Sequence, residues 1–101
     1  MESILRQTPH GFTVTGVLDF QHVLQVRDLG LQWLRVWPVA DIEIDLANTV
    51  CDSAGLAVCV AWWREAVKNH KQIIWRQVLP DVRTLARAYG LETILGLERP
   101  I

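Results

Sequence analysis

The segment from Asp41 to Leu46 constrains the fold of this chain more than any other. It reads Asp-Ile-Glu-Ile-Asp-Leu, so acidic and large aliphatic residues alternate strictly. Successive side chains of a β-strand point to opposite faces of a sheet, and the segment therefore predicts a strand with one apolar and one acidic face. We expect the apolar face to be buried and the acidic face to meet solvent.

Other segments predict strands and helices around this strand. Two short strand-like segments flank Pro9-His10-Gly11, which favours a turn, and together they predict an N-terminal hairpin. Further along, strands alternate with helices, which implies crossover connections and parallel pairing, so that the whole sheet is mixed. The expected strands span 4–7, 12–17, 41–46 and 71–78, and the expected helices span 20–37, 54–69 and 80–89.

Residues at the helix ends support these boundaries. Asp19 is available as the N-cap of the first helix, which Gly30 weakens by roughly 1 kcal/mol relative to Ala. Pro80 suits the first turn of the last helix, and Gly90 suits a left-handed helix end. The core-facing stripe expected in that helix consists of Val82, Leu85, Ala86 and Tyr89.

The second helix has apolar residues on more than one side. The expected buried face consists of Leu56, Cys59, Val60, Trp63 and Val67. A rotation of about 100° per residue then places Val58 and Ala61 near the opposite side and Trp62 at the flank. Such an outward apolar strip would suit a docking surface. The alternative is that Trp62 packs against a neighbouring helix within the fold.

Composition and charge limit the classes of function. The chain has 101 residues, 50% hydrophobic and 21% charged, which predicts one globular domain over 1–101. A net charge of -1 without a basic block argues against nucleic-acid binding. No run of about 18 apolar residues and no signal-like N-terminus occurs, so we expect a cytoplasmic protein that does not itself insert into a membrane.

No set of residues predicts a catalytic or metal site. His10, His22 and His70 fall in separate elements without metal-ligand spacing. Ser53 lacks the glycine pattern of a nucleophile elbow, and Cys59 falls in an apolar helical pattern, where a thiol acts as a small hydrophobe. We therefore predict a protein that is not an enzyme and holds no cofactor or metal.

The segment from Asp45 to Leu56 runs from a strand through polar residues into a helix. Its Asp52-Ser53-x-Gly55-Leu56 resembles the signature of STAS domains at the start of their second helix. Two further segments resemble the same family: Gly16-Val17-Leu18-Asp19 before the first helix, and Val82 to Leu91 in the last. The resemblance implies an α/β fold of the STAS (SpoIIAA-like) type, a mixed sheet of about four strands with helices packed mainly on one side.

Within that family the chain is most similar to the MlaB subfamily, through Asp52-Ser53-x-Gly55-Leu56-Ala57 and Thr84-Leu85-Ala86-x-x-Tyr89. This similarity implies a cytoplasmic subunit of a phospholipid-transport system, peripheral to the inner membrane through its partner. The implied partner is an MlaF-like ATPase subunit of an ABC transporter, in a complex with a membrane permease.

Ser53 leaves two interpretations open. MlaB proteins carry Thr at this position, whereas anti-sigma-factor antagonists of the same fold carry a Ser that is phosphorylated. We expect the Ser53 hydroxyl to act as the N-cap of the second helix, and the positive end of the helix dipole would also favour an added phosphate there. Trp62 and Trp63 stand where the family usually has aliphatic residues. The expected partner-binding or regulatory residues are Asp52, Ser53, Ala54, Gly55, Leu56, Val58 and Trp62, with Ser53 the candidate for phosphorylation.

Overall fold

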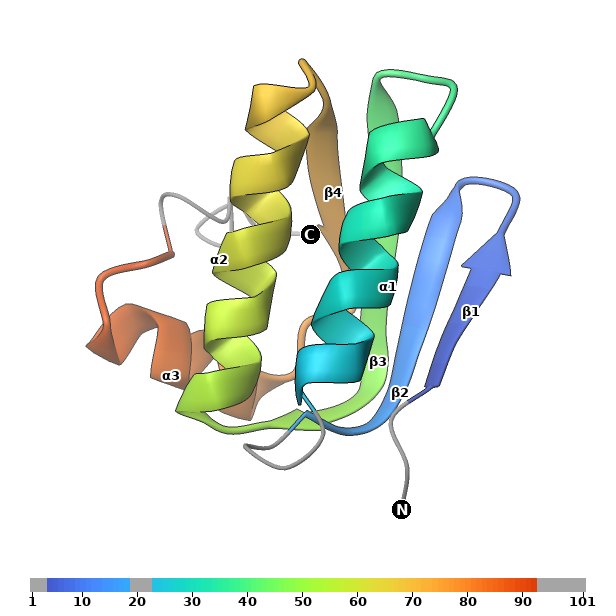
Figure 1. Ribbon diagram of the computed structural model, residues 1–101. Helices are drawn as coiled ribbons and strands as arrows, with labels where there is room; N and C mark the ends of the chain where they lie inside the picture. Colours follow the sequence, from blue (N-terminus) through green and yellow to red (C-terminus); the bar gives the residue numbers. More distant parts are fainter. Residues whose placement is uncertain (1–3, 19–22, 93–101) are drawn as a thin grey trace.

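The computed structural model describes residues 4–18 and 23–92, and within them the chain forms four strands and three helices (Figure 1). The expected start of the first helix at Phe20 and its expected N-cap, Asp19, lie outside the described residues, and so does His22. The elements are β1 (Ile4–Thr8), β2 (Gly11–Leu18), α1 (Val23–Val36), β3 (Asp41–Cys51), α2 (Ser53–Lys68), β4 (Gln72–Arg76) and α3 (Pro80–Ala88).

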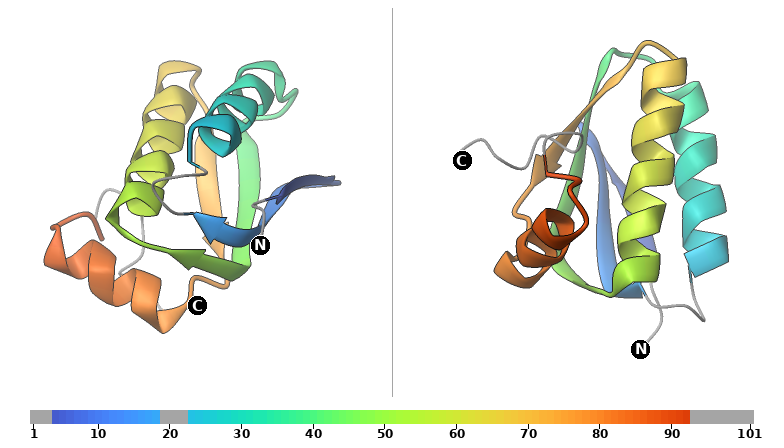
Figure 2. Two further views of the ribbon diagram at one scale, coloured as in Figure 1. Left: turned by 60° about the horizontal axis from the view of Figure 1, so that its bottom comes forward. Right: turned by 90° about the vertical axis from the view of Figure 1, so that its left-hand side faces the viewer.

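The strands form one mixed sheet in the order β1-β2-β3-β4. β1 and β2 are the antiparallel hairpin that the turn at Pro9-His10 predicts, and β2, β3 and β4 are parallel. The connections through α1 and α2 cross over one face of the sheet, and both helices pack there (Figures 1 and 2). The predicted α/β class and the mixed sheet with helices mainly on one side are therefore confirmed.

The alternation in β3 divides the sheet as expected. Ile42, Ile44 and Leu46 are buried beneath the helices, with at most 2% of their surface exposed. On the other face, Glu43 forms an ion pair with Arg76 of the neighbouring strand, with 2.7 Å between Oε1 and Nη2. The acids thus lie on a polar face, where cross-strand pairs of opposite charge are modestly stabilising.

β3 is longer than the alternating segment predicts, because it continues through a bulge to Cys51. The register against β2 shifts between Thr13 and Thr15, and an extra residue in one strand inverts the inside-outside alternation beyond it. Thr49 consequently faces the core with 1% exposure. Its hydroxyl donates to the carbonyl of Val14 at 2.6 Å, which satisfies a buried polar group.

α3 lies on the β4 side of the molecule, next to the first turns of α2 (Figures 1 and 2). Pro80 opens it, and Gly90 follows it in the left-handed conformation at φ 69°. The N–H groups of Gly90 and Leu91 bond back to the carbonyls of Arg87 (3.1 Å) and Ala86 (2.9 Å), the arrangement of a Schellman helix end. Both predicted helix ends are confirmed.

Tyr89, which was expected in the core-facing stripe of the last helix, is not in the core. Tyr89 is 59% exposed, since the helix ends at Ala88 and the chain has already left the helical path there. Leu24 is 61% exposed on the first turn of α1. The buried side of α1 is instead formed by Val26, Gly30, Leu34 and the following Trp37.

Candidate partner-binding site

β3 passes into α2 through Asp52, which is the N-cap of the helix. Its side-chain Oδ1 accepts hydrogen bonds from the N–H groups of Ala54 (2.9 Å) and Gly55 (3.1 Å). These are two of the four N–H groups that a helix start leaves without an internal acceptor. The prediction that Ser53 caps the helix is wrong, because Ser53 is already the first helical residue.

The first turn of α2 is partly open to solvent. Asp52 and Ser53 are exposed and Ala54 is half-buried, whereas Gly55 and Leu56 are buried. Gly55 therefore offers little surface to a partner. Of the expected signature residues, the structure leaves Asp52, Ser53 and Ala54 accessible and encloses the other two.

A strip of small residues continues from Ser53 along the outside of α2. Ala57 is exposed one turn after Ser53, and Ala61 is half-buried one turn later. Positions four residues apart lie above one another on a helix, so Ser53, Ala57 and Ala61 form one row, which we call the α2 outer strip. The sequence-based prediction places Ala61 on the outward side of this helix, but it does not identify Ser53 and Ala57 as part of the same row.

α2 is rotated relative to the sequence-based expectation. Its buried residues are Gly55, Leu56, Val58, Cys59, Trp62 and Ala66, and five of them follow the i, i+3, i+4, i+7, i+11 pattern from Gly55. The predicted outward apolar strip is thus wrong: Val58 is 2% exposed and Trp62 is fully buried. Val67, expected in the core, is 53% exposed. The alternative, that Trp62 packs against a neighbouring helix, is the one observed.

The rotation follows from how Trp62 meets α1. Its ring packs edge-on against Phe12 with centroids 5.4 Å apart, and its Nε1 donates to the carbonyl of Arg27 at 3.1 Å. Gly30 of α1 makes room for it, because a Cβ there would lie 2.5 Å from Cε2 of the indole. A buried indole N–H needs an acceptor, and this contact provides both the acceptor and the space.

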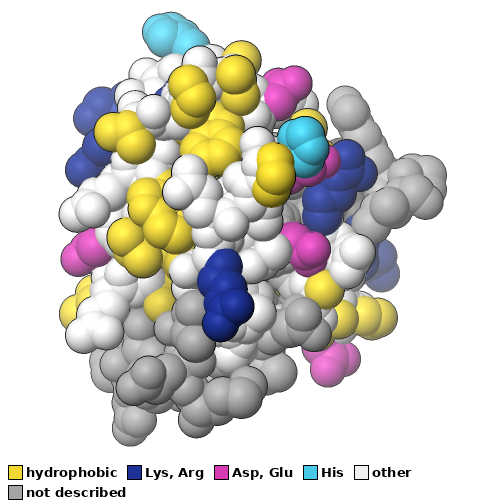
Figure 3. All heavy atoms as spheres, turned by 90° about the vertical axis from the view of Figure 1, so that its right-hand side faces the viewer, with side chains coloured by type: hydrophobic (Ala, Val, Ile, Leu, Met, Phe, Trp, Pro, Cys, Tyr) yellow, Lys and Arg dark blue, Asp and Glu magenta, His cyan; other side chains and the backbone are white. Residues whose placement is uncertain are grey.

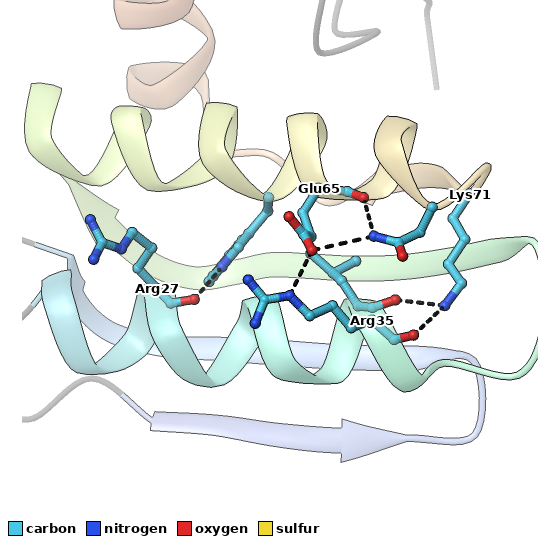
Figure 4. Close-up of polar contacts among 7 residues, drawn as sticks. Arg27, Arg35, Glu65 and Lys71 are labelled. Atoms are coloured by element: carbon cyan, nitrogen blue, oxygen red, sulfur yellow. Dashed lines mark hydrogen bonds and ion pairs between the residues drawn. The ribbon is translucent and has the colours of Figure 1, made fainter.

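Polar contacts fasten the other ends of α1 and α2 together (Figure 4). Glu65 of α2 accepts from Nε of Arg35 at 2.6 Å, and Nζ of Lys71 donates to the carbonyl of Leu34 at 2.6 Å. The hydrogen bond from Arg35 holds the pKa of Glu65 below its ordinary value, against the opposing effect of desolvation. These contacts hold α1 and α2 together as one layer, and the α2 outer strip lies on the outside of that layer.

Within 4–18 and 23–92, no three His, Cys, Asp or Glu residues lie close enough together to hold a metal ion. No helix of the same ranges is long and apolar enough to cross a membrane. The Ser53 hydroxyl is accessible at the positive end of a helix, where an anion is favoured.

Comparison with known proteins agrees with this fold. The family described as Mlab, STAS domain matches residues 5–97. The anti-sigma factor antagonist SpoIIAA in its unphosphorylated form has a TM-score of 0.71 at 21% identity, over 90% of this chain and 83% of that chain. The Bacillus cell fate determinant SpoIIAA in the phosphorylated form has a TM-score of 0.67 at 21% identity, over 90% of this chain and 86% of that chain. No curated protein sequence matches the chain.

Proposed function

The chain belongs to the STAS domain family, and from this premise we propose that it is a non-enzymatic, partner-binding subunit of the MlaB type. STAS domains mediate contacts between proteins, and residues 1–101 form one such domain in this proposal. Its partner is the cytoplasmic ATPase of an ABC transporter for phospholipids, whose complex also contains a membrane permease. The subunit supports assembly or activity of that complex and reaches the inner membrane through the ATPase.

The observation that carries this proposal is the accessible first turn of α2. Ser53 and Ala57 present small side chains that let another protein approach the helix closely. Asp52 is already engaged in capping, so the turn has its shape before a partner arrives. A preorganised surface loses little conformational entropy on binding, which favours affinity.

The charge at Ser53 tests the docking role. In Ser53→Asp the added charge lies near the positive end of the helix, so the domain should stay folded. On docking, however, that charge must leave water without a matched counter-charge, so affinity for the ATPase should fall at least tenfold, about 1.4 kcal/mol. Ser53→Thr keeps the hydroxyl and should bind as the unchanged chain does.

Gln32→Asp on the exposed side of α1 is a matched control for added charge and should leave binding unchanged. The measurement is the affinity of the purified ATPase for each variant, with thermal melting as the check on folding. If Ser53→Asp is folded and binds the ATPase as well as the unchanged chain, the docking role of Ser53 is wrong.

A second candidate function is a phosphorylation switch of the anti-sigma-factor-antagonist class. Two observations favour it: the Ser53 hydroxyl is exposed at a helix start, and SpoIIAA, a protein of this fold, has been captured in a phosphorylated form. A pull-down from native membranes separates the two candidates. Recovery of an ABC ATPase with a permease supports the MlaB-type function, and recovery of a small kinase with phosphate on Ser53 supports the switch.

A further inference from the structure

One side of α1 carries apolar residues that the domain does not cover. Leu29 is 37% exposed, Val36 is 76% exposed, and Trp33 between them is half-buried, with its ring edge-on to Phe12 at 5.5 Å. Their spacing of four and three residues places them in one row, which we call the α1 outer stripe. Figure 3 looks onto this side of the molecule, where apolar side chains gather.

α1 lies beside β1, which is an edge strand of the sheet (Figure 1). Trp33 of the α1 outer stripe contacts Phe12, whose cross-strand partner in β1 is Gln7. Leu5 is the apolar residue of β1 on the helix-covered side, since its cross-strand partner is the buried Val14. A further strand at the usual spacing of about 4.8 Å from β1 would therefore lie beside the α1 outer stripe and Leu5.

The hydrogen bonds of β2 show which groups of β1 point outward. The N–H of Glu43 bonds to the carbonyl of His10, and the Thr49 hydroxyl bonds to the carbonyl of Val14, so even-numbered positions of β2 face β3. Odd-numbered positions must then face β1, where their partners are Ile4, Arg6 and Thr8. It follows that the N–H and C=O groups of Leu5 and Gln7 point away from the sheet. Unpaired groups of this kind are a template for another strand.

Charge indicates what kind of strand fits. Arg6 is exposed on the sheet face away from the helices, across from Thr13, and among the described residues it forms no ion pair. By contrast, Arg76 on the same face is paired with Glu43. An antiparallel strand bonded to Leu5 and Gln7 places one residue directly opposite Arg6, in the type of pair whose side chains lie closest.

We propose that β1 and the α1 outer stripe form a docking site for an extended segment of a partner protein, which adds a strand beside β1. The segment has an acidic residue opposite Arg6 and an apolar residue on either side of it. Those two apolar side chains point to the helix-covered face, where they meet Leu5 and the α1 outer stripe. The main-chain bonds supply affinity, and the alternating side chains supply specificity.

A second copy of this chain fits the edge less well. Antiparallel self-pairing that uses the outward groups of both Leu5 and Gln7 sets two Arg6 side chains opposite each other, and like charges in that position are destabilising. Shifting the register to centre on Gln7 aligns Leu5 with Pro9, which has no N–H to donate. In both of these registers a second copy meets an obstacle, whereas an acidic strand meets the opposite charge of Arg6.

The test uses two synthetic peptides, acetyl-Ser-Thr-Val-Glu-Val-Thr-Ser-amide and its counterpart with Lys in place of Glu. Titration into the isotopically labelled chain is followed by NMR, with hydrogen exchange of the Leu5 and Gln7 amides as a second measurement. We expect the acidic peptide to bind at least fivefold more tightly than the basic one, to shift resonances of β1 and α1, and to protect both amides. Arg6→Glu should reverse the preference between the peptides.

Gln7→Pro removes one outward N–H and should weaken both peptides, while Ser53→Asp, which alters the other surface, should change neither. Thermal melting shows whether each variant is folded, and the reversal in Arg6→Glu does not depend on Gln7→Pro folding. Equal affinities for the two peptides, absence of binding at millimolar peptide, or shifts confined to α2 would each overturn the proposal. So would a dimer that forms through β1 in sedimentation of the unchanged chain.

Discussion

Replacing Gly30 by Ala should destabilise the domain, although the same change stabilises most helices. Ala is about 1 kcal/mol better than Gly inside a helix. At this position, however, the new Cβ would lie 2.5 Å from Cε2 and 2.7 Å from Cζ2 of Trp62, against about 3.5–4.0 Å for a normal contact. The indole is fully buried, and protein interiors are closely packed, so moving it would displace neighbouring side chains.

The magnitude follows from three contributions. Overpacking a tight core costs about 1–3 kcal/mol, and displacing the indole weakens its 3.1 Å hydrogen bond to the carbonyl of Arg27, which contributes about 1 kcal/mol. The gain in helix propensity offsets about 1 kcal/mol of this loss. We therefore expect the free energy of unfolding of Gly30→Ala to fall by about 1–3 kcal/mol, with Tm lowered by roughly 5–20 °C.

Urea unfolding followed by circular dichroism measures this change, with Gln32→Ala on the exposed side of the same helix as the control. A Trp62→Leu background isolates the cause, because without the indole Gly30→Ala should become neutral or stabilising by up to about 1 kcal/mol. The reasoning is refuted if Gly30→Ala stabilises the unchanged chain, or if it has the same effect in both backgrounds.

Three further outcomes are expected. Asp52→Ala should lower stability by about 1 kcal/mol in urea unfolding, whereas Ser53→Ala should change it by less than about 0.5 kcal/mol, because Asp52 and not Ser53 accepts the capping bonds. The pKa of Glu65 is lowered in the folded chain, so its ionised form stabilises the fold above the ordinary carboxyl pKa of 4.5, and this stability is lost as pH falls through the lowered pKa. The free energies of unfolding of Glu65→Gln and of the unchanged chain should therefore differ at neutral pH and converge in acid. The purified chain should hydrolyse no nucleotide, and ATPase activity that survives further purification would contradict its assignment as a non-enzymatic subunit.

The order and type of the secondary-structure elements were readable from the sequence because their signals are local. The alternation at Asp41 to Leu46 depends only on neighbouring residues, and so do the turn at Pro9-His10 and the helix ends at Pro80 and Gly90. The family signature at Asp52 to Leu56 is likewise contiguous. These features were sufficient to predict the mixed sheet and to direct attention to the start of α2.

The exact cap of α2 was not readable, because Asp and Ser are almost equally good N-caps and stand next to each other. The choice depends on where β3 ends, and β3 continues to Cys51 only because it stays paired with β2 beyond the bulge. The extended backbone of Asp52 then leaves its carboxylate, rather than the Ser53 hydroxyl, in reach of the free N–H groups.

The rotation of α2 was decided by tertiary structure alone. Its sequence offers two apolar sides, one with Val60 and Trp63 and one with Val58 and Trp62, and hydrophobicity does not distinguish them. What distinguishes them is the facing helix, where Gly30 leaves space for one indole and the carbonyl of Arg27 accepts its N–H. That acceptor is 35 residues away from Trp62 in the chain, so no local pattern reports it. The same contact decides which small side chains of α2 remain open to a partner.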